Sequence, residues 1–254
     1  MDAPDNDTLQ GLRLLVADDN SVNRTLLSAL AANLGARCET VNDGSQAIAR
    51  VLEQRYDCVI LDLRMPEVDG YTAARAISQL AGAPPLLAFS ADADPEVHAA
   101  IREAGFSGLL QKPLSEARLR EAVLGCLRGE DSIGAAASAD SDVVHDRAAA
   151  IEAAGGNATL AAELFQMLRD DLAKKRRQLP AHRDEPAVFL DLVHQIHGAA
   201  GHCRADRLRQ AAARLEAELR RHDRGPRPEL VDARHARLLE EIDALLALPD
   251  PFAG

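Results

Sequence analysis

The stretch LRLLVADDN, residues 12–20, decides how the first half of the chain folds. Its apolar run ends in the pair Asp18 and Asp19, and an amphipathic segment follows at residues 22–34. A short apolar run followed by an amphipathic helix is typical of a parallel sheet that carries helices on its faces. We therefore expect a buried strand over residues 12–17, with the two aspartates at its carboxyl end.

The same alternation of strand and helix continues to about residue 128. Further strands are expected at residues 37–41, 58–61, 86–89 and 108–110, and further helices at residues 45–54, 71–80, 95–104 and 115–127. Gly35 and Gly105 stand where two of the helices should end. Five strands alternating with five helices predict an α/β domain with a doubly wound parallel sheet.

No strand pattern appears in the second half of the chain. Residues 129–142, GEDSIGAAASADSD, combine small and acidic side chains, which is typical of a linker. Beyond it, helices are expected at residues 143–154, 158–182, 186–203, 205–222 and 228–247, and they predict an all-α antiparallel bundle. The expected organisation is a lead at residues 1–10, an α/β domain at 11–128, the linker at 129–142, the bundle at 143–248 and a tail at 249–254.

The composition of the 254-residue chain excludes several classes of protein. Charged residues make up 27% and hydrophobic residues 47%, so the chain can bury a core. Aromatic residues at 3%, no Trp and a net charge of −11 disfavour stacking on single-stranded nucleic acid and general binding to DNA or membranes. No apolar run approaches the ~20 residues of a membrane span, and the start MDAPDNDTLQ does not resemble a signal peptide. The four cysteines show no paired spacing, so we expect a cytoplasmic protein with reduced thiols.

Three carboxylates follow strands of the predicted sheet. Asp18 and Asp19 follow the first strand and Asp62 follows the third. The carboxyl ends of parallel strands meet at one rim, where three acids repel one another unless a cation lies among them. Mg²⁺ prefers such oxygen ligands and often binds a phosphoryl oxygen as well. The alternative is that the acids are helix caps or solvated loop residues.

Two further residues follow strands at the same rim. Ser90 follows the fourth strand, and Lys112 follows the fifth. A hydroxyl and a compact ammonium there would bind phosphoryl oxygens, and phosphoryl transfer depends mainly on positioning and charge neutralisation. Lys112 is the only lysine in the first 173 residues of a chain that otherwise uses arginine, which favours a specific role over a chance surface lysine.

The motifs LLVADDN, LDLRMPEVDG, FSA and QKP, in this order, resemble the receiver domain of two-component response regulators over about residues 11–128. The resemblance implies a flavodoxin-like fold and an aspartate that accepts phosphate from a phosphohistidine. Asp62 matches this acceptor. Asp18 and Asp19 match the acidic pair that binds Mg²⁺, and the main-chain carbonyl of Arg64 matches the third protein ligand of the metal.

The remaining rim residues also match receiver positions, with one departure. The resemblance implies that Ser90 is the switch hydroxyl, that Lys112 binds the phosphate and that Pro113 follows a cis peptide bond. The family usually has an aromatic residue three positions before this lysine, where the chain has Leu109. We therefore expect a receiver that relays phosphate rather than one that drives an output domain through an aromatic switch.

The segment LDLVHQIHGAAGHC, residues 190–203, carries the histidines of the second half. On a helix, its apolar residues form one stripe, and His194 should project away from it into solvent. Gly198 and Gly201 should lie on the same exposed side, where bare backbone would let another protein reach the imidazole. The alternatives are a zinc site that includes His202 and Cys203, a general base, for which we expect no partner carboxylate, or an ordinary surface histidine.

This segment resembles a histidine phosphotransfer (HPt) domain, and its His-x-x-His-Gly pattern is similar to that of hybrid sensor kinases of the BarA/GacS type. The resemblance implies that His194 forms the phosphohistidine and that His197 assists as a donor or cation. One departure is Arg204-Ala205-Asp206, where that group usually has Gly-Val-Pro.

These features predict a phosphorelay protein whose partners are a histidine kinase and a downstream receiver or response regulator. We find no ATP-binding signature, so we expect a phosphotransfer protein rather than an enzyme, and leave open whether the chain is the tail of a histidine kinase. One alternative is a DNA-binding response regulator, suggested by the basic run at residues 174–177 and an arginine-rich helix. Against it, residues 143–254 carry a net charge of only −1. The other alternative is a Mg²⁺-dependent phosphatase on the α/β domain.

Overall fold

The computed structural model describes residues 8–91, 95–130, 132–133, 143–221 and 227–253. The chain divides into two compact units, Met1–Ala137 and Ser138–Gly254. Each unit is described by itself.

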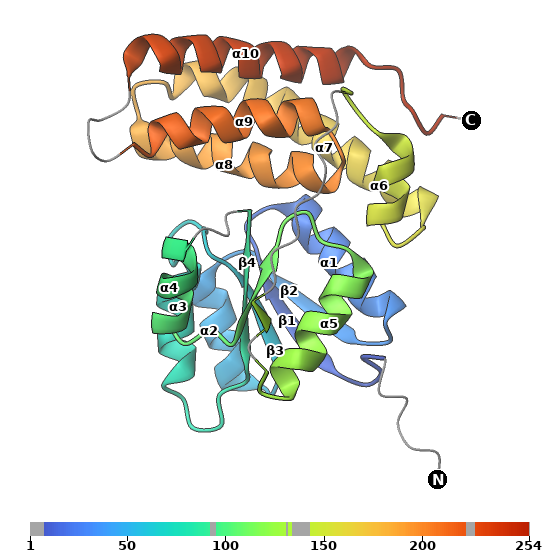
Figure 1. Ribbon diagram of the computed structural model, residues 1–254, viewed down its shortest axis with the longest axis vertical. Helices are drawn as coiled ribbons and strands as arrows, with labels where there is room; N and C mark the ends of the chain where they lie inside the picture. The colour runs from blue at the N-terminus through green and yellow to red at the C-terminus, as the bar shows by residue number, and fades with distance from the viewer. Residues whose placement is uncertain (1–7, 92–94, 131, 134–142, 222–226, 254) are drawn as a thin grey trace. The chain divides into compact units, whose positions relative to one another are not determined.

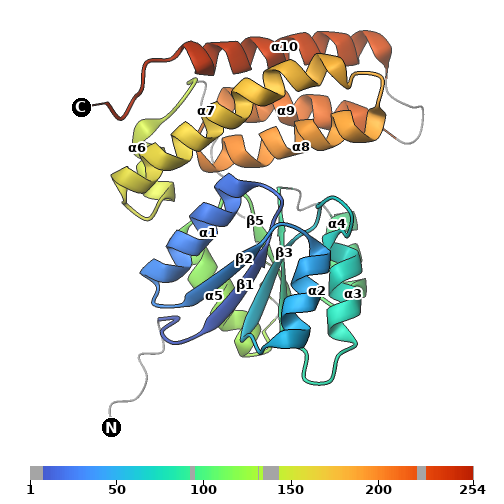
Figure 2. The same cartoon turned by 180° about the vertical axis from the view of Figure 1, so that it is seen from behind.

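The first unit is built on a parallel sheet with the strand order β2-β1-β3-β4-β5-β6. The strands are β1 (Arg13–Ala17), β2 (Arg37–Val41), β3 (Cys58–Asp62), β4 (Leu86–Ser90), β5 (Gly108–Gln111) and β6 (Ser132–Ile133). The helices are α1 (Ser21–Asn33), α2 (Gly44–Glu53), α3 (Gly70–Ser78), α4 (Pro95–Glu103) and α5 (Glu116–Leu127). Figures 1 and 2 show α1 and α5 on one face of the sheet and α2, α3 and α4 on the other. The predicted doubly wound α/β fold is therefore confirmed.

Burial on both faces explains why the central strands read as unbroken apolar runs. All five residues of β3 and all five residues of β4 are buried, because helices cover the sheet on each side.

Side chains at the start of several helices fix where those helices begin. Asn20 accepts the N–H of Val22 at the start of α1, and Asp69 accepts the N–H of Thr72 at the start of α3.

The sixth strand was not expected. Ser132 and Ile133 pair in parallel with Gly108 and Leu109 of β5, inside the stretch expected to be a linker. A strand of two residues is too short to produce a hydrophobic period, so the sequence carries no pattern that would reveal it.

The second unit is a helical bundle, as predicted. Its helices are α6 (Arg147–Ala153), α7 (Ala158–Ala181), α8 (Pro186–His202), α9 (Asp206–Leu219) and α10 (Pro228–Ala247). Helix α8 packs on α7 and α9, and α10 packs on α9 and α7, while the short α6 rests on α7 (Figure 2). The left-handed backbone of Gly155 and Gly156 ends α6, and Pro186 starts α8. In the described part of the chain, no helix has the length and apolar character required to span a membrane.

Candidate functional site

The sheet of the first unit brings three aspartates together at the carboxyl ends of β1 and β3. Carboxylate oxygens of Asp18, Asp19 and Asp62 all lie within 4.8 Å of one another. Asp18 is 0% exposed and Asp62 is 2% exposed. The topology places them there because β1 and β3 are parallel neighbours, so the residues that end them reach the same rim.

Lys112, which follows β5, reaches into this cluster. Its ammonium donates to Asp62 Oδ2 at 2.8 Å and to Asp18 Oδ2 at 3.3 Å, and it lies 4.5 Å from the centre of the Phe89 ring. The peptide bond between Lys112 and Pro113 is cis, as the resemblance implied. Backbone pairing fixes the position of the lysine, because its N–H donates to the carbonyl of Ser90 at 2.8 Å.

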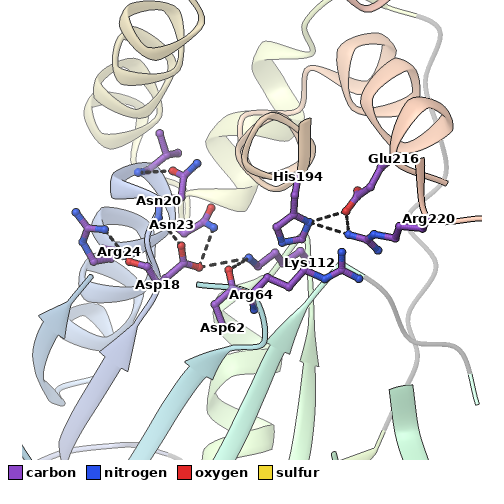
Figure 3. A network of polar contacts seen from close by, with 11 residues as sticks. Asp18, Asn20, Asn23, Arg24, Asp62, Arg64, Lys112, His194, Glu216 and Arg220 are labelled. Atoms are coloured by element: carbon purple, nitrogen blue, oxygen red, sulfur yellow. Dashed lines mark hydrogen bonds and ion pairs between the residues drawn. The ribbon is translucent and has the colours of Figure 1, made fainter. Parts of the chain in front are cut away.

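Groups in α1 and directly before it hold Asp18 in place, and the sequence did not reveal them (Figure 3). The N–H of Asn20 donates to Asp18 Oδ1 at 2.8 Å, and the amide of Asn23 donates to Oδ2 at 2.9 Å. Arg24 donates to the main-chain carbonyl of Asp18 at 2.7 Å. The available signal was a polar Asn23 on the face of α1 that carries Val22, Leu26 and Leu30, where it is buried.

The electrostatics of the rim favour a bound cation. Burial raises the pKa of Asp18 to about 7, the charges of Asp62 and Asp19 add to this effect, and Lys112 opposes it. Burial alone would lower the pKa of Lys112, but the two carboxylates outweigh burial and raise it. One ammonium therefore faces three carboxylates. These oxygens are the hard ligands that Mg²⁺ prefers, so the residues present fit this metal.

The other predicted rim residues lie at the ends of neighbouring strands. Ser90 is the last residue of β4, where it is 5% exposed and pairs in register with Gln111 of β5. The N–H of Arg64 donates to Asp62 Oδ1 at 3.4 Å. The assignment of the Arg64 carbonyl as a metal ligand stays a prediction.

Leu109 is buried in β5 rather than poised at the surface. It is 4% exposed and belongs to the same core cluster as Ile101, Ala104 and Phe106. The position at which the resemblance implies a switching aromatic residue is thus occupied by a core side chain.

In the second unit, His194 contacts a carboxylate of the same unit, which was not expected for a histidine that simply projects into solvent. Its Nδ1 lies 2.7 Å from Glu216 Oε1 on α9. The guanidinium of Arg220 contacts the same carboxylate and lies 3.4 Å from His194 Nδ1 (Figure 3). The imidazole is therefore held by a buried carboxylate of α9 that is ion-paired with the arginine directly after that helix.

His197 uses the other oxygen of the same carboxylate. Its Nδ1 lies 2.7 Å from Glu216 Oε2. The expectation that the bundle offers no partner carboxylate was therefore wrong. Glu216 directly follows Leu215 on α9, so it is buried at the edge of an apolar stripe. A glutamate next to the apolar stripe of an arginine-rich helix was the available signal, but one sequence does not reveal which histidine it faces.

Gly201, which was expected on the exposed side of the helix, faces α9 instead. A Cβ on Gly201 would lie 3.3 Å from Arg209 Cδ on α9, so this glycine lets the side chain of Arg209 lie close to α8. The zinc alternative gains no support. Cys203 Sγ contacts the carbonyl of Leu164, and the aspartate cluster is the only group of three or more candidate metal ligands among the described residues.

Comparison with known families defines the class of this protein. Residues 14–124 match the response regulator receiver domain family, and residues 159–248 match the Hpt domain family. The chain thus joins a segment of the receiver domain family to a segment of the Hpt domain family, the two kinds of domain that exchange phosphate in a phosphorelay. Neither match supports the DNA-binding or the phosphatase alternative.

The particular proteins that this chain resembles are hybrid sensor kinases, as the histidine motif implied. Sensor histidine kinase GacS of Pseudomonas protegens is 31% identical over 225 residues, which cover 83% of this chain and 24% of GacS. Signal transduction histidine-protein kinase BarA of Escherichia coli is 28% identical over 243 residues, which cover 91% of this chain and 26% of BarA. The chain therefore spans about a quarter of the length of these relatives.

Among solved structures, the receiver domain of sensor histidine kinase PA1611 from Pseudomonas aeruginosa is 33% identical. The structural match covers 46% of this chain and 98% of the PA1611 domain, with a TM-score of 0.44. Its crystal structure holds a magnesium ion in the active site cleft.

Proposed function

We propose that the receiver, residues 11–128, accepts a phosphoryl group on Asp62, and that the Hpt domain, residues 143–248, carries one on His194, with residues 129–142 as the linker. The observation that carries the proposal is the buried ammonium of Lys112 at 2.8 Å from Asp62 Oδ2, beside two further carboxylates. Such an arrangement supplies positive charge where phosphoryl oxygens arrive and leaves the acidic pair to hold a metal.

At the receiver, an Asp62 oxygen attacks the phosphorus of a phosphohistidine. The O–P bond forms, the N–P bond breaks, and the electron pair of that bond returns to the imidazole of the donor. Asp18, Asp19, Asp62 and the Arg64 carbonyl are the groups that would hold Mg²⁺. When bound, the metal neutralises charge on the phosphoryl oxygens.

Lys112 and Ser90 have separate roles in this proposal. Lys112 leaves its ion pair with Asp62 to bind a phosphoryl oxygen, while Phe89 beneath the ammonium keeps it at the rim. Ser90 ends the adjacent strand and donates its hydroxyl to another phosphoryl oxygen. Both groups bind the product acyl phosphate without reacting themselves.

At the Hpt domain, His194 Nε2 attacks the phosphorus of an aspartyl phosphate. The N–P bond forms, the O–P bond breaks, and the aspartate leaves as a carboxylate. The ring keeps its proton on Nδ1 and becomes positively charged, and Glu216 at 2.7 Å from Nδ1 stabilises that charge.

The partners proposed for this chain follow from its two chemistries. A histidine kinase supplies the phosphoryl group, and a receiver, either this one or that of a downstream response regulator, exchanges it with His194. The hybrid kinase relatives support this assignment of partners. We also propose a cytoplasmic location, which the free cysteines of the chain support.

Labelling with acetyl phosphate in the presence of Mg²⁺ tests the receiver half of the proposal. We expect the full chain to gain alkali-labile phosphate, and Asp62→Asn to abolish that label while the protein stays folded. Asp57→Asn is the matched control, because Asp57 is an aspartate next to the start of β3 rather than at its rim end. Full labelling of the Asp62→Asn variant would contradict the assignment.

A further inference from the structure

One buried carboxylate in the bundle is shared by two imidazoles from the same helix. Glu216 Oε1 lies 2.7 Å from Nδ1 of His194, and Oε2 lies 2.7 Å from Nδ1 of His197. The Glu216 side chain is only 3% exposed. Each oxygen of this carboxylate is therefore engaged by a different ring.

The chemistry of the shared carboxylate fixes the protonation of both rings. The guanidinium of Arg220 contacts Glu216, which favours the ionised carboxylate. Arg220 also lies 3.4 Å from His194 Nδ1, but Glu216 Oε1 at 2.7 Å is the closer partner of that nitrogen. An ionised carboxylate only accepts hydrogen bonds, so each imidazole must donate through an Nδ1–H. A neutral ring with a proton on Nδ1 carries its lone pair on Nε2. Glu216 thus holds both imidazoles in the same tautomer.

The geometry points to His197 as a positioning residue that acts on His194 through Glu216. This inference rests on the proposed role of His194 and replaces the expectation that His197 binds the phosphate as a cation. With Oε2 held by His197, the carboxylate cannot turn both oxygens toward Arg220. Oε1 therefore stays directed at His194 Nδ1, and His194 Nε2 keeps the lone pair that attacks phosphorus.

Three substitutions of His197 separate positioning from charge. His197→Asn places an amide N–H close to where Nδ1–H stood, so it can still donate to Glu216, but it carries no charge and no nucleophile. His197→Ala removes the donor, and His197→Lys adds a permanent cation on a longer, flexible stem. We expect transfer to His194 to fall about 10- to 100-fold in the Ala variant. We expect Asn, and not Lys, to restore most of that loss.

The tautomer of His194 gives a readout that does not depend on phosphate. Long-range ¹H–¹⁵N correlation spectra of the full chain, labelled at histidine, should show the Nδ1–H form of His194 in the wild type and in His197→Asn. A mixture of the two tautomers is expected in His197→Ala. The matched control is His182→Ala, which removes another Nδ1 contact to a glutamate, Glu185 at 3.0 Å, outside this site.

A Glu216→Gln variant tests the carboxylate itself. An amide offers one acceptor oxygen, so one of the two rings must move its proton to Nε2. Retention of Nδ1–H on both rings, an unchanged His194 tautomer in His197→Ala, or rescue by Lys but not by Asn would overturn the inference. If the tautomers shift as expected while His194 never accepts phosphate, the positioning role stands and the proposed function fails.

Discussion

Lys112 shows how the chemistry of one side chain decides what the rim can do. Its Nζ lies within 3.3 Å of two buried carboxylates, and a compact ammonium fits between them. The planar guanidinium of arginine presents its donors in a fixed fork and requires more space. Because the Lys112 side chain is only 3% exposed, the larger group has no room to relax into solvent.

We therefore predict that Lys112→Arg lowers the yield of acyl phosphate from acetyl phosphate and Mg²⁺ by about 10-fold or more, on the scale of losing one charge-stabilising group. Lys174→Arg makes the same change at an exposed position on α7 and should leave the yield unchanged. Equal labelling of the two variants would show that a positive charge is sufficient at the rim, whatever the shape of the group that carries it.

The residues of the receiver rim could be predicted from sequence because each directly follows, or ends, a strong apolar strand. Asn23 and Glu216 could not. Their importance comes from what they face, Asp18 in one case and two imidazoles in the other. When the partner of a residue lies on a different helix or strand, the hydrophobic period of the residue's own segment does not reveal that partner.

At the level of single elements, β5 carries the residue on which our prediction for the response to phosphate depends. Leu109 is packed in the same core cluster as Phe106, and β5 carries no aromatic residue that could move in and out. We predict that beryllofluoride with Mg²⁺ produces large backbone amide shifts at the rim and small ones along α4 and β5. Shifts on α4 and β5 comparable with those at Asp62 would show that Leu109 takes part in a switch.

The segment that leads into α6 contains a titratable group, the imidazole of His145. His145 packs against Phe165 at a ring distance of 4.3 Å and Phe252 at 5.7 Å, and neither of its ring nitrogens has a hydrogen-bond partner among the described residues. Burial lowers the pKa of His145 to about 4, and Asp146 opposes the shift. The folded state therefore favours the neutral ring.

This shift predicts that the bundle loses stability on acidification. The unfolded chain, with a histidine pKa near ~6.5, binds more protons than the folded chain as pH falls from about 6.5 to 4. Stability is fully present above this window and is lost through it. Between pH 7.5 and 5, the unfolding temperature of the second unit should fall further in the wild type than in His145→Phe, by about 4 °C or more. Unfolding is monitored through the NMR signals of α7. An equal fall in unfolding temperature in the two proteins would contradict this prediction.

Element boundaries could be predicted closely where the period was strong. Helices α7, α8 and α10 begin at the expected residues, because an asparagine cap or a proline marks each start. Strand β6 was missed because it forms only by pairing with β5. Its two residues have no hydrophobic pattern of their own.

For the whole molecule, the central feature is that one chain carries two groups that we propose as complementary phosphoryl acceptors. The first unit offers an aspartate beside a buried lysine, and the second offers an imidazole held by Glu216. The α/β and all-α halves were predictable because their hydrophobic periods differ. The chemistry of the second half was less predictable from the sequence, because it depends on how α8 packs against α9.

Mapping of phosphate by chemical stability after labelling with acetyl phosphate and Mg²⁺ tests the central claim most directly. Acyl phosphate on aspartate is lost in alkali, whereas phosphohistidine survives alkali and is lost in acid. We predict both kinds of label on the wild-type chain, only the alkali-labile label on His194→Gln, and neither on Asp62→Asn. An alkali-stable label that survives in His194→Gln, or that never forms on the wild-type chain even when a phosphorylated downstream response regulator is supplied, would contradict the claim that His194 carries the phosphoryl group.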